Sequence, residues 1–205
     1  MRPMVVEILT NALYLLTLIN PVSKVSVLLA LSGAERQAEA KALVAKSSLI
    51  AMCILLGSMV FGHFILRSIF HVSLDALRIA GGAILFWVGF NALRKGVFFE
   101  QPLVGQYTDL AIVPLACPMI AGPATIAASI GLWAHGDSAG PVISLLIALW
   151  VNYLIMRWAS GPVYNQLHRI NILGALIRIT GLIVMTIGTQ MALDGIGHWI
   201  AETEY

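Results

Sequence analysis

Two short stretches of the chain combine a helix-breaking proline with small polar side chains, and these residue types suit the binding of a small ligand. The residues concerned are Asn20, Pro21, Ser23 and Lys24 in the first stretch, and Ala121, Gly122, Pro123 and Thr125 in the second. Proline lacks a backbone N–H and its ring clashes with the carbonyl four residues earlier, so a helix must kink or open there. A helix that begins after such a break points its first N–H groups and positive dipole end at the break. With two hydroxyls and one ammonium nearby, the pair of breaks predicts a cradle for a carboxylate.

Arg78 and Arg178 form a second candidate group, because each lies about one turn inside an apolar stretch. Either guanidinium could bind a carboxylate in one conformational state or hold a gate by charge pairing, since ionisable residues within membrane spans are functional candidates by default. The alternative is that the side chains snorkel to the lipid headgroups. Lys24 is open to the same two interpretations, and a proline kink can also serve packing alone.

The elements that carry these residues are apolar to a degree that excludes a soluble globular protein. Of the 205 residues, 59% are hydrophobic and 11% are charged, whereas an average soluble domain has roughly 25% charged residues. The net charge is only +2, and the few cations lie between long apolar stretches. Such a chain lacks the dense basic surface that neutralises a run of phosphates, so nucleic acid is not an expected partner.

Six segments are long enough to cross a bilayer core about 30 Å thick, which needs about 20 mostly apolar residues per helix. They are residues 8–31, 47–66, 74–93, 110–134, 140–158 and 172–193. The links between them are short, so we expect one transmembrane domain over residues 1–205. Asn20 lies about twelve residues into the first segment, roughly 18 Å deep and near the bilayer centre. The fold class expected is an all-α integral membrane protein with spans one and four broken near the midplane.

The chain also contains an internal repeat with an offset of about 100 residues. Residues 78–81 read Arg-Ile-Ala-Gly and residues 178–181 read Arg-Ile-Thr-Gly, while the two proline breaks fall in spans one and four. The repeats extend over residues 1–95 and 108–200. Because each has three spans, the second must enter the membrane from the opposite side, which predicts two inverted three-helix repeats. The glycines of spans three and six permit close helix contact, either between the repeats or across a homo-oligomer face.

Lys and Arg in the short links set the expected orientation. The links after spans one, three and five and the end of span five hold most of them, and the opposite side has only two. The first group is Arg36, Lys41, Lys46, Arg94, Lys95, Arg157 and Arg169, and the second is Arg2 and Arg67. Since positive loops stay in the cytoplasm, we expect both termini to lie outside it.

The chain has few residues suited to covalent or metal chemistry. Cys53 and Cys117 lie far apart with no second thiol or histidine cluster beside them, so neither a zinc site nor a disulfide framework is expected. We expect no catalytic residues, no metal and no cofactor, and therefore no enzyme. Two alternatives to transport remain: a membrane thiol redox conduit that uses both cysteines, or a membrane assembly partner that transports nothing.

Several motifs resemble the MarC family of inner-membrane proteins. They are residues 20–22 (Asn-Pro-Val), 77–82 (Leu-Arg-Ile-Ala-Gly-Gly), 114–116 (Pro-Leu-Ala) and 121–127 (Ala-Gly-Pro-Ala-Thr-Ile-Ala). The resemblance implies six helices, an inner-membrane location, a place near the superfamily typified by lysine exporters and, for some members, classification as neutral amino acid transporters. The chain departs from the family pattern at Ser23 and Ser26, where glycine and proline are common, and at Ala124, where glycine is common.

Taken together, the residues predict a secondary transporter that moves a small polar solute by alternating access. That the solute is a neutral amino acid or a related metabolite is what the resemblance implies. The expected partners are this solute and membrane lipid, with a homo-oligomer as the open possibility left by the glycine-rich faces.

Overall fold

The computed structural model describes residues 4–31, 37–98, 116–117, 119–135, 139–160 and 173–203, and within these ranges the chain is almost entirely helical, with no β-strand. The all-α prediction is therefore confirmed for this part of the chain. The elements are α1 (Met4–Ile19), α2 (Pro21–Leu31), α3 (Gln37–Phe64), the π-helix η2 (Ile65–Ile69), α4 (Leu74–Lys95), α6 (Pro123–His135), α7 (Ala139–Ala159) and α9 (Leu173–Thr203).

Five helical segments are long and apolar enough to cross a membrane, and they correspond to predicted spans one, two, three, five and six. They are Met4–Val25, Ala38–Ile69, Leu74–Lys95, Ala139–Ala159 and Gly174–Ala201. Predicted span four is represented by the shorter apolar helix Pro123–Ala134, and its residues 110–115 lie outside the described ranges. The helices of predicted spans two and six, Ala38–Ile69 and Gly174–Ala201, run beyond the predicted ends at residues 66 and 193.

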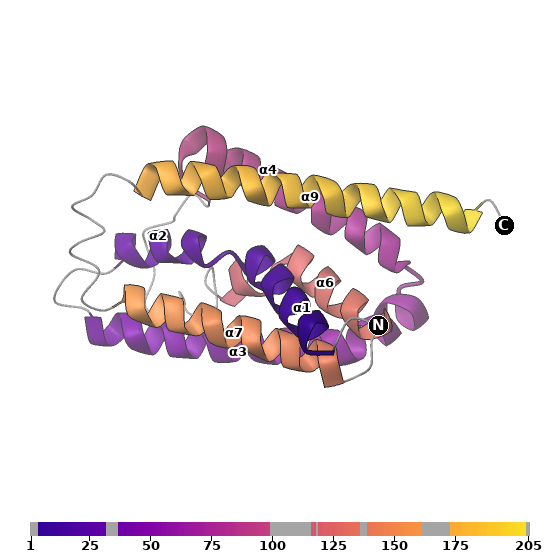
Figure 1. Ribbon diagram of the computed structural model, residues 1–205, viewed down its shortest axis with the longest axis horizontal. Coiled ribbons are helices and arrows are strands. Elements are labelled where there is room, and N and C mark those ends of the chain that lie inside the picture. Colours follow the sequence, from indigo (N-terminus) through magenta and orange to yellow (C-terminus); the bar gives the residue numbers. More distant parts are fainter. Residues whose placement is uncertain are drawn as a thin grey trace.

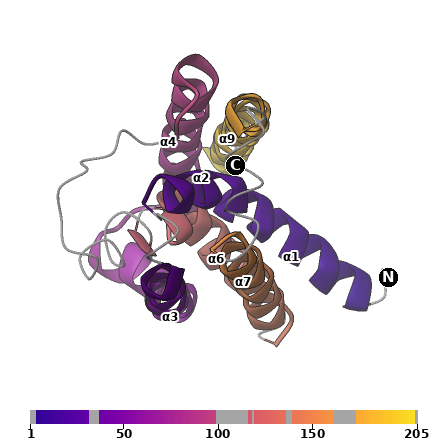
Figure 2. The ribbon, with the colours of Figure 1, turned by 90° about the vertical axis from the view of Figure 1, so that its left-hand side faces the viewer.

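The helices form three layers. In Figure 1 and Figure 2, α4 and α9 make one outer layer, α3 and α7 make the other, and α1, α2 and α6 lie between them. The two breaks therefore lie between the outer layers, while the start of α1 projects from the bundle (Figure 2). This arrangement gives irregular backbone at membrane depth the burial within protein that it requires.

The ends of the helices are sorted between the two ends of the bundle. Four parts of the chain lie at the right in Figure 1: the start of α1, the end of α9, the segment between α3 and α4, and the end of α6 with the start of α7. We call this the terminal end of the bundle. The six predicted spans would bring both ends of the chain to one side in this way. The placement of that side outside the cytoplasm stays a prediction.

A glycine seam joins α4 to α9, which run antiparallel. A Cβ atom on Gly82 would lie 2.5 Å from the carbonyl oxygen of Gly188, and a Cβ on Gly89 would lie 2.5 Å from that of Gly181. Only glycine permits backbones to approach so closely, which is how small residues promote helix association in membranes. The close contact expected from these glycines is thus made within one chain, between its first and second halves.

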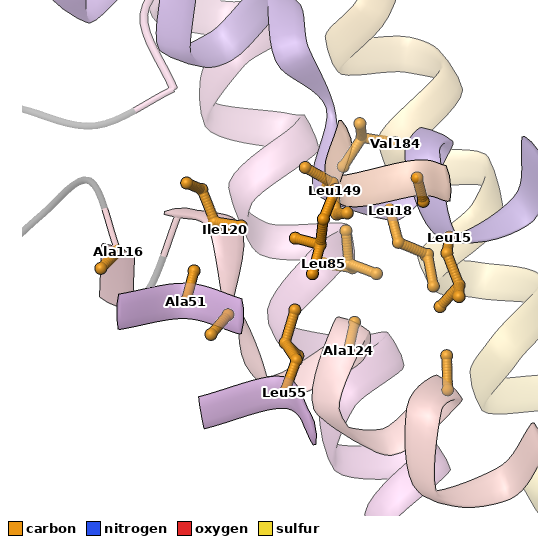
Figure 3. Packing of buried hydrophobic residues seen from close by; sticks show 14 of the residues in the cluster. Leu15, Leu18, Ala51, Leu55, Leu85, Ala116, Ile120, Ala124, Leu149 and Val184 are labelled. Carbon is orange, nitrogen blue, oxygen red and sulfur yellow. The ribbon is translucent and has the colours of Figure 1, made fainter. Parts of the chain in front are cut away.

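The other main helix contacts also join the first half of the chain to the second half. Helix α1 packs against α7, and α6 packs against α3, while α3 also contacts α7. The hydrophobic core where these helices meet includes Leu15 and Leu18 from α1, Leu55 from α3 and Leu85 from α4. Figure 3 shows these side chains converging with Ala124, Leu149 and Val184 from the other helices. The core therefore lies directly beside the breaks.

Local signals in the sequence set the ends of α4, which contributes to every cavity described below. The hydroxyl of Ser73 caps its start by accepting a hydrogen bond from the Ala76 N–H at 3.1 Å. Gly96 ends it in the left-handed conformation, with φ of 71°. A hydroxyl before the first turn is a usual signal for a helix start, and a glycine after the last turn is a usual signal for a helix end.

Candidate functional site

The first helix break lies at Asn20, between α1 and α2. The Asn20 N–H donates to the Leu16 carbonyl at 2.9 Å and so completes α1, after which Asn20 adopts a positive φ of 51°. Asparagine tolerates this left-handed conformation better than most residues. Pro21 then occupies the first position of α2, where a missing N–H costs nothing. The predicted break in span one is thereby confirmed.

The second break lies at Ala121 and Gly122, directly before α6. The Ala121 N–H donates to the Ala116 carbonyl at 2.8 Å, a wide five-residue step, and α6 begins afresh at Pro123. The Ile126 N–H returns to the Gly122 carbonyl at 2.9 Å. Because Pro123 has no N–H, the helix presents the first-turn N–H groups of Ala124 and Thr125 without intrahelical acceptors. The predicted interruption of span four is also confirmed.

Both breaks line one partly open space, which we call the central cavity. It has a volume of about 130 Å³. Asn20 and Ser23 line it from the first break, and Gly122, Pro123 and Thr125 line it from the second. The remaining wall is apolar. It consists of Leu18, Ile19, Ile84, Leu85, Val88, Phe98, Met119, Ala124 and Val184. The structure therefore brings together five of the eight predicted binding residues from segments about 100 positions apart.

Three predicted binding residues lie beside the central cavity but outside its lining: Pro21, Lys24 and Ala121. Lys24 is fully buried, and its ammonium donates hydrogen bonds to the backbone carbonyls of Ile19 and Asn20, the latter at 3.2 Å. The carbonyls at a helix C-terminus lack intrahelical donors and carry the negative end of the dipole. Lys24 thus caps α1 across the break.

The hydroxyl of Ser23 also supports the first break. It donates to the Asn20 carbonyl at 2.7 Å, and the Ser23 N–H reaches the same oxygen at 3.2 Å. This carbonyl therefore accepts bonds from two side chains, which holds the left-handed turn in place. Thr125 is its counterpart at the second break and is likewise buried, at 2% exposure. Together they give the cavity two hydroxyls and the start of one helix as polar groups.

A larger polar space opens at the terminal end, and we call it the terminal cleft. It has a volume of about 340 Å³, and its polar lining consists of Glu7, Asn11, Tyr14, Arg78, Asp194 and His198. Its other walls include Ala127 and Ala128 of α6 and Met191 of α9. The same four helices, α1, α4, α6 and α9, line both the cleft and the central cavity. The cleft therefore lies one to two turns from the cavity along a shared set of helices.

Arg78 and Arg178 are not brought together. Arg78 is largely buried and donates to the Asp75 carboxylate at 3.0 Å, and its guanidinium lies near Gly131 of α6. Arg178 is exposed and donates to the Leu93 carbonyl at 2.9 Å. They lie at opposite ends of the α4–α9 pair, and of the two only Arg78 lines the terminal cleft.

Sequence reasoning missed the terminal cleft because it treated its acidic residues singly, as charges at span ends. One signal was present: Glu7, Arg78 and Asp194 lie at the same ends of spans one, three and six once the spans alternate in direction. Helix ends on the same side of a membrane can meet, so the shared position of these three charged residues predicts a polar cleft on that side.

The cysteines give no support to redox chemistry. Cys53 and Cys117 are both free and exposed, and Cys53 lies on a groove between α3 and α6. Among the described residues, no group of three or more His, Cys, Asp and Glu side chains is arranged to hold a metal ion.

Comparisons with known proteins extend over nearly the whole chain. The sequence profile described as "MarC family integral membrane protein" matches residues 5–200. A UPF0056 membrane protein of Pyrococcus horikoshii is 38% identical over 194 residues, covering 95% of each chain. The membrane protein YvbG of Bacillus subtilis is 29% identical, covering 86% of this chain and 88% of its own. The inner membrane protein YhgN of Escherichia coli K12 is 28% identical, covering 95% and 98%.

No solved structure matches the chain significantly. The family match, the apolar helices and the whole-length relatives agree with one another. The chain belongs to the MarC family of integral membrane proteins.

Proposed function

We propose that the chain is a secondary transporter of the inner membrane that binds a small polar solute in the central cavity and moves it by alternating access. The observation that carries the proposal is that two separate helix breaks, one in each half, line the same cavity. Transporters place substrate sites near the midplane between discontinuous helices in this way. Packing alone would not require both breaks to face a cavity.

The size and lining of the cavity support a very small solute. A cavity of about 150 Å³ accommodates one benzene molecule, so the 130 Å³ here suits a solute with about six non-hydrogen atoms. Thr125, Ser23 and the first N–H groups of α6 suit an oxygen-rich end, and the apolar wall suits a short aliphatic part. Glycine, alanine and serine have this size and character. The proposed substrate class is therefore a neutral amino acid or related metabolite.

The contacts between helices support two inverted repeats of three spans. Exchanging the halves turns the α2–α7 contact into the α6–α3 contact, and both are present. The seam centres midway between Gly82 and Gly89 on α4 and midway between Gly181 and Gly188 on α9. These midpoints, 85.5 and 184.5, are 99 residues apart, close to the offset of 100 between Arg78 and Arg178. A twofold axis in the membrane plane through this point would relate the halves.

The terminal cleft supports an access path to the cavity from one side. It is polar and shares four helices with the cavity, so a solute entering there would reach the breaks by passing Leu15, Leu18 and Met191. In this proposal, Asn20 and Gly122 are the hinges at which the half-helices tilt to open the other side. The protein carries out no covalent chemistry, and its partners are the solute and the lipid. The name of YhgN supports the inner membrane as its location.

Uptake into proteoliposomes tests the proposal. Thr125→Val removes the cavity hydroxyl with little change in shape, and Thr186→Val is the matched control because its hydroxyl bonds only along α9, to the Leu182 carbonyl at 2.9 Å. We expect purified protein to take up labelled glycine, alanine or serine. Loss of one buried hydrogen bond should weaken the apparent affinity of Thr125→Val about tenfold, with Thr186→Val unchanged. Absence of uptake by the folded wild type, or equal affinities in the two variants, would contradict the proposal.

A further inference from the structure

Two clefts adjoin at the terminal end of α3, and they differ sharply in character. The first, which we call the basic cleft, has a volume of about 450 Å³ and is lined from η2, the η2–α4 link, the start of α4 and the end of α9. The second, the apolar groove, has a volume of about 480 Å³ and runs between α3 and α6. Leu66 lines both. The two spaces therefore lie on either side of one residue and are direct neighbours.

The basic cleft has the composition of an anion site. Its charged and titratable lining comprises Arg67, Arg78, His63, His71, His198 and Asp75. Asp75 is the single carboxylate among these lining residues, and it pairs with Arg78 at 3.0 Å. Arg67 adds an exposed positive charge on η2. The cleft also contains the start of α4, whose first N–H groups and positive dipole end favour an anion.

The apolar groove has the form of a channel for a hydrocarbon chain. Its wall on α3 and η2 extends from Cys53 to Leu66, a length of about 20 Å at 1.5 Å per residue. Half of a bilayer core is about 15 Å thick, so the groove is long enough for a lipid tail. Ile126 and Ile130 of α6 form the opposite wall, and Phe61 at its edge is 61% exposed. In a membrane protein, such an exposed face contacts lipid.

We propose that the basic cleft and the apolar groove together bind one glycerophospholipid. Its phosphodiester lies in the cleft near Arg67 and the start of α4, and one acyl chain lies along α3 in the groove. The charge of the cleft selects the phosphate, and the polar-to-apolar order from Arg67 to Cys53 matches the direction of a lipid from headgroup to tail. This site is separate from the central cavity and holds whether or not the protein transports a solute.

Two matched pairs of variants test the proposal. Arg67→Gln removes the headgroup charge, and Arg157→Gln removes an exposed arginine in the last turn of α7 that lines neither cleft. A side chain at Gly57 would enter open space within the groove, because nothing lies within 4 Å of a Cβ built there. Gly57→Leu therefore adds bulk to the groove at a position where the first side-chain atom meets no neighbour. Gly174→Leu is its control, since Gly174 is equally unobstructed but lies at the start of α9.

The measurement is native mass spectrometry of delipidated protein titrated with palmitoyl-oleoyl-phosphatidylglycerol, after each variant is shown to unfold cooperatively. We expect one tightly bound copy in the wild type and in both controls. Loss of one charge-assisted contact should weaken binding about tenfold in Arg67→Gln, and Gly57→Leu should lose the tight copy.

Binding of dioleoylglycerol, which lacks the phosphate, or of glycerol 3-phosphate, which lacks the tails, should be far weaker than binding of the phospholipid. The proposal is overturned if Arg67→Gln and Gly57→Leu bind like their controls, which would indicate general lipid contact only. It is also overturned if either half-molecule binds as tightly as the intact phospholipid. None of these outcomes depends on transport activity.

Discussion

The glycine seam between α4 and α9 allows one substitution to be predicted quantitatively. Gly82→Ala would place a Cβ atom 2.5 Å from the Gly188 carbonyl oxygen and 2.7 Å from the Ala192 nitrogen. Both neighbours are backbone atoms, so no side chain can rotate away. Favourable carbon contacts lie at about 3.5–4.0 Å, so α9 would have to move by about 1 Å. Such a shift would loosen the whole seam.

Gly57→Ala is the matched control for this substitution. It also replaces a mid-helix glycine by alanine, but nothing lies within 4 Å of the added Cβ. Both variants gain about 1 kcal/mol of helix propensity, whereas only Gly82→Ala incurs an overpacking cost of about 1–3 kcal/mol. The difference between the two variants is therefore about 1–3 kcal/mol in the free energy of unfolding.

The assay is thermal unfolding of the two purified variants in the same detergent. At about 2–4 °C per kcal/mol for a chain of this size, the midpoint of Gly82→Ala should lie roughly 2–12 °C below that of Gly57→Ala. Equal midpoints would refute the reasoning, because they would mean that α4 and α9 are not in backbone contact along the seam.

Two further predictions concern the helix breaks. Lys24→Met should lower the free energy of unfolding by about 1–3 kcal/mol, because the buried Ile19 carbonyl loses its ammonium donor and the Asn20 carbonyl keeps only the Ser23 donors. The exposed Lys46→Met serves as control in the same thermal assay, and matching midpoints would argue against the capping role. Pro21→Ala and Pro123→Ala should reduce proteoliposome uptake while membrane insertion stays intact. A restored N–H favours a continuous helix by about 1 kcal/mol, which shifts the population roughly fivefold against the broken form, and undiminished uptake in the inserted double variant would count against the hinges.

The breaks themselves could be predicted from the sequence because their cause is local. A proline inside an apolar segment removes a backbone hydrogen bond wherever the segment packs. Pro21 and Pro123 therefore indicate the two breaks without any knowledge of the tertiary structure. The same applies to the ends of α4, where Ser73 and Gly96 are recognisable caps. The convergence of both breaks on one cavity is what the predicted repeat, suggested by the residues around Arg78 and Arg178, would produce.

The properties that the sequence did not reveal depend on which groups meet in space. Lys24 was expected to be a ligand because an ammonium near a break can bind a carboxylate, yet the nearest acceptors are the carbonyls that the break itself frees. The terminal cleft depends on how the ends of α1, α4 and α9 pack, and residue types alone do not specify those distances. Similarly, the length of α9 depends on how far the helix extends beyond the hydrocarbon.

The glycine seam also determines which parts of the molecule are free to move. The backbones of α4 and α9 are in direct contact at these glycines, so neither helix can slide along the other without first separating from it. The two helices therefore behave as one rigid pair. Gly96 beside Arg178, and Gly131 of α6 beside Arg78, lie near the two ends of this pair. The pair is therefore the part of the molecule that can change shape least, and in the proposed alternating access the α1–α7 and α3–α6 pairs would move relative to it.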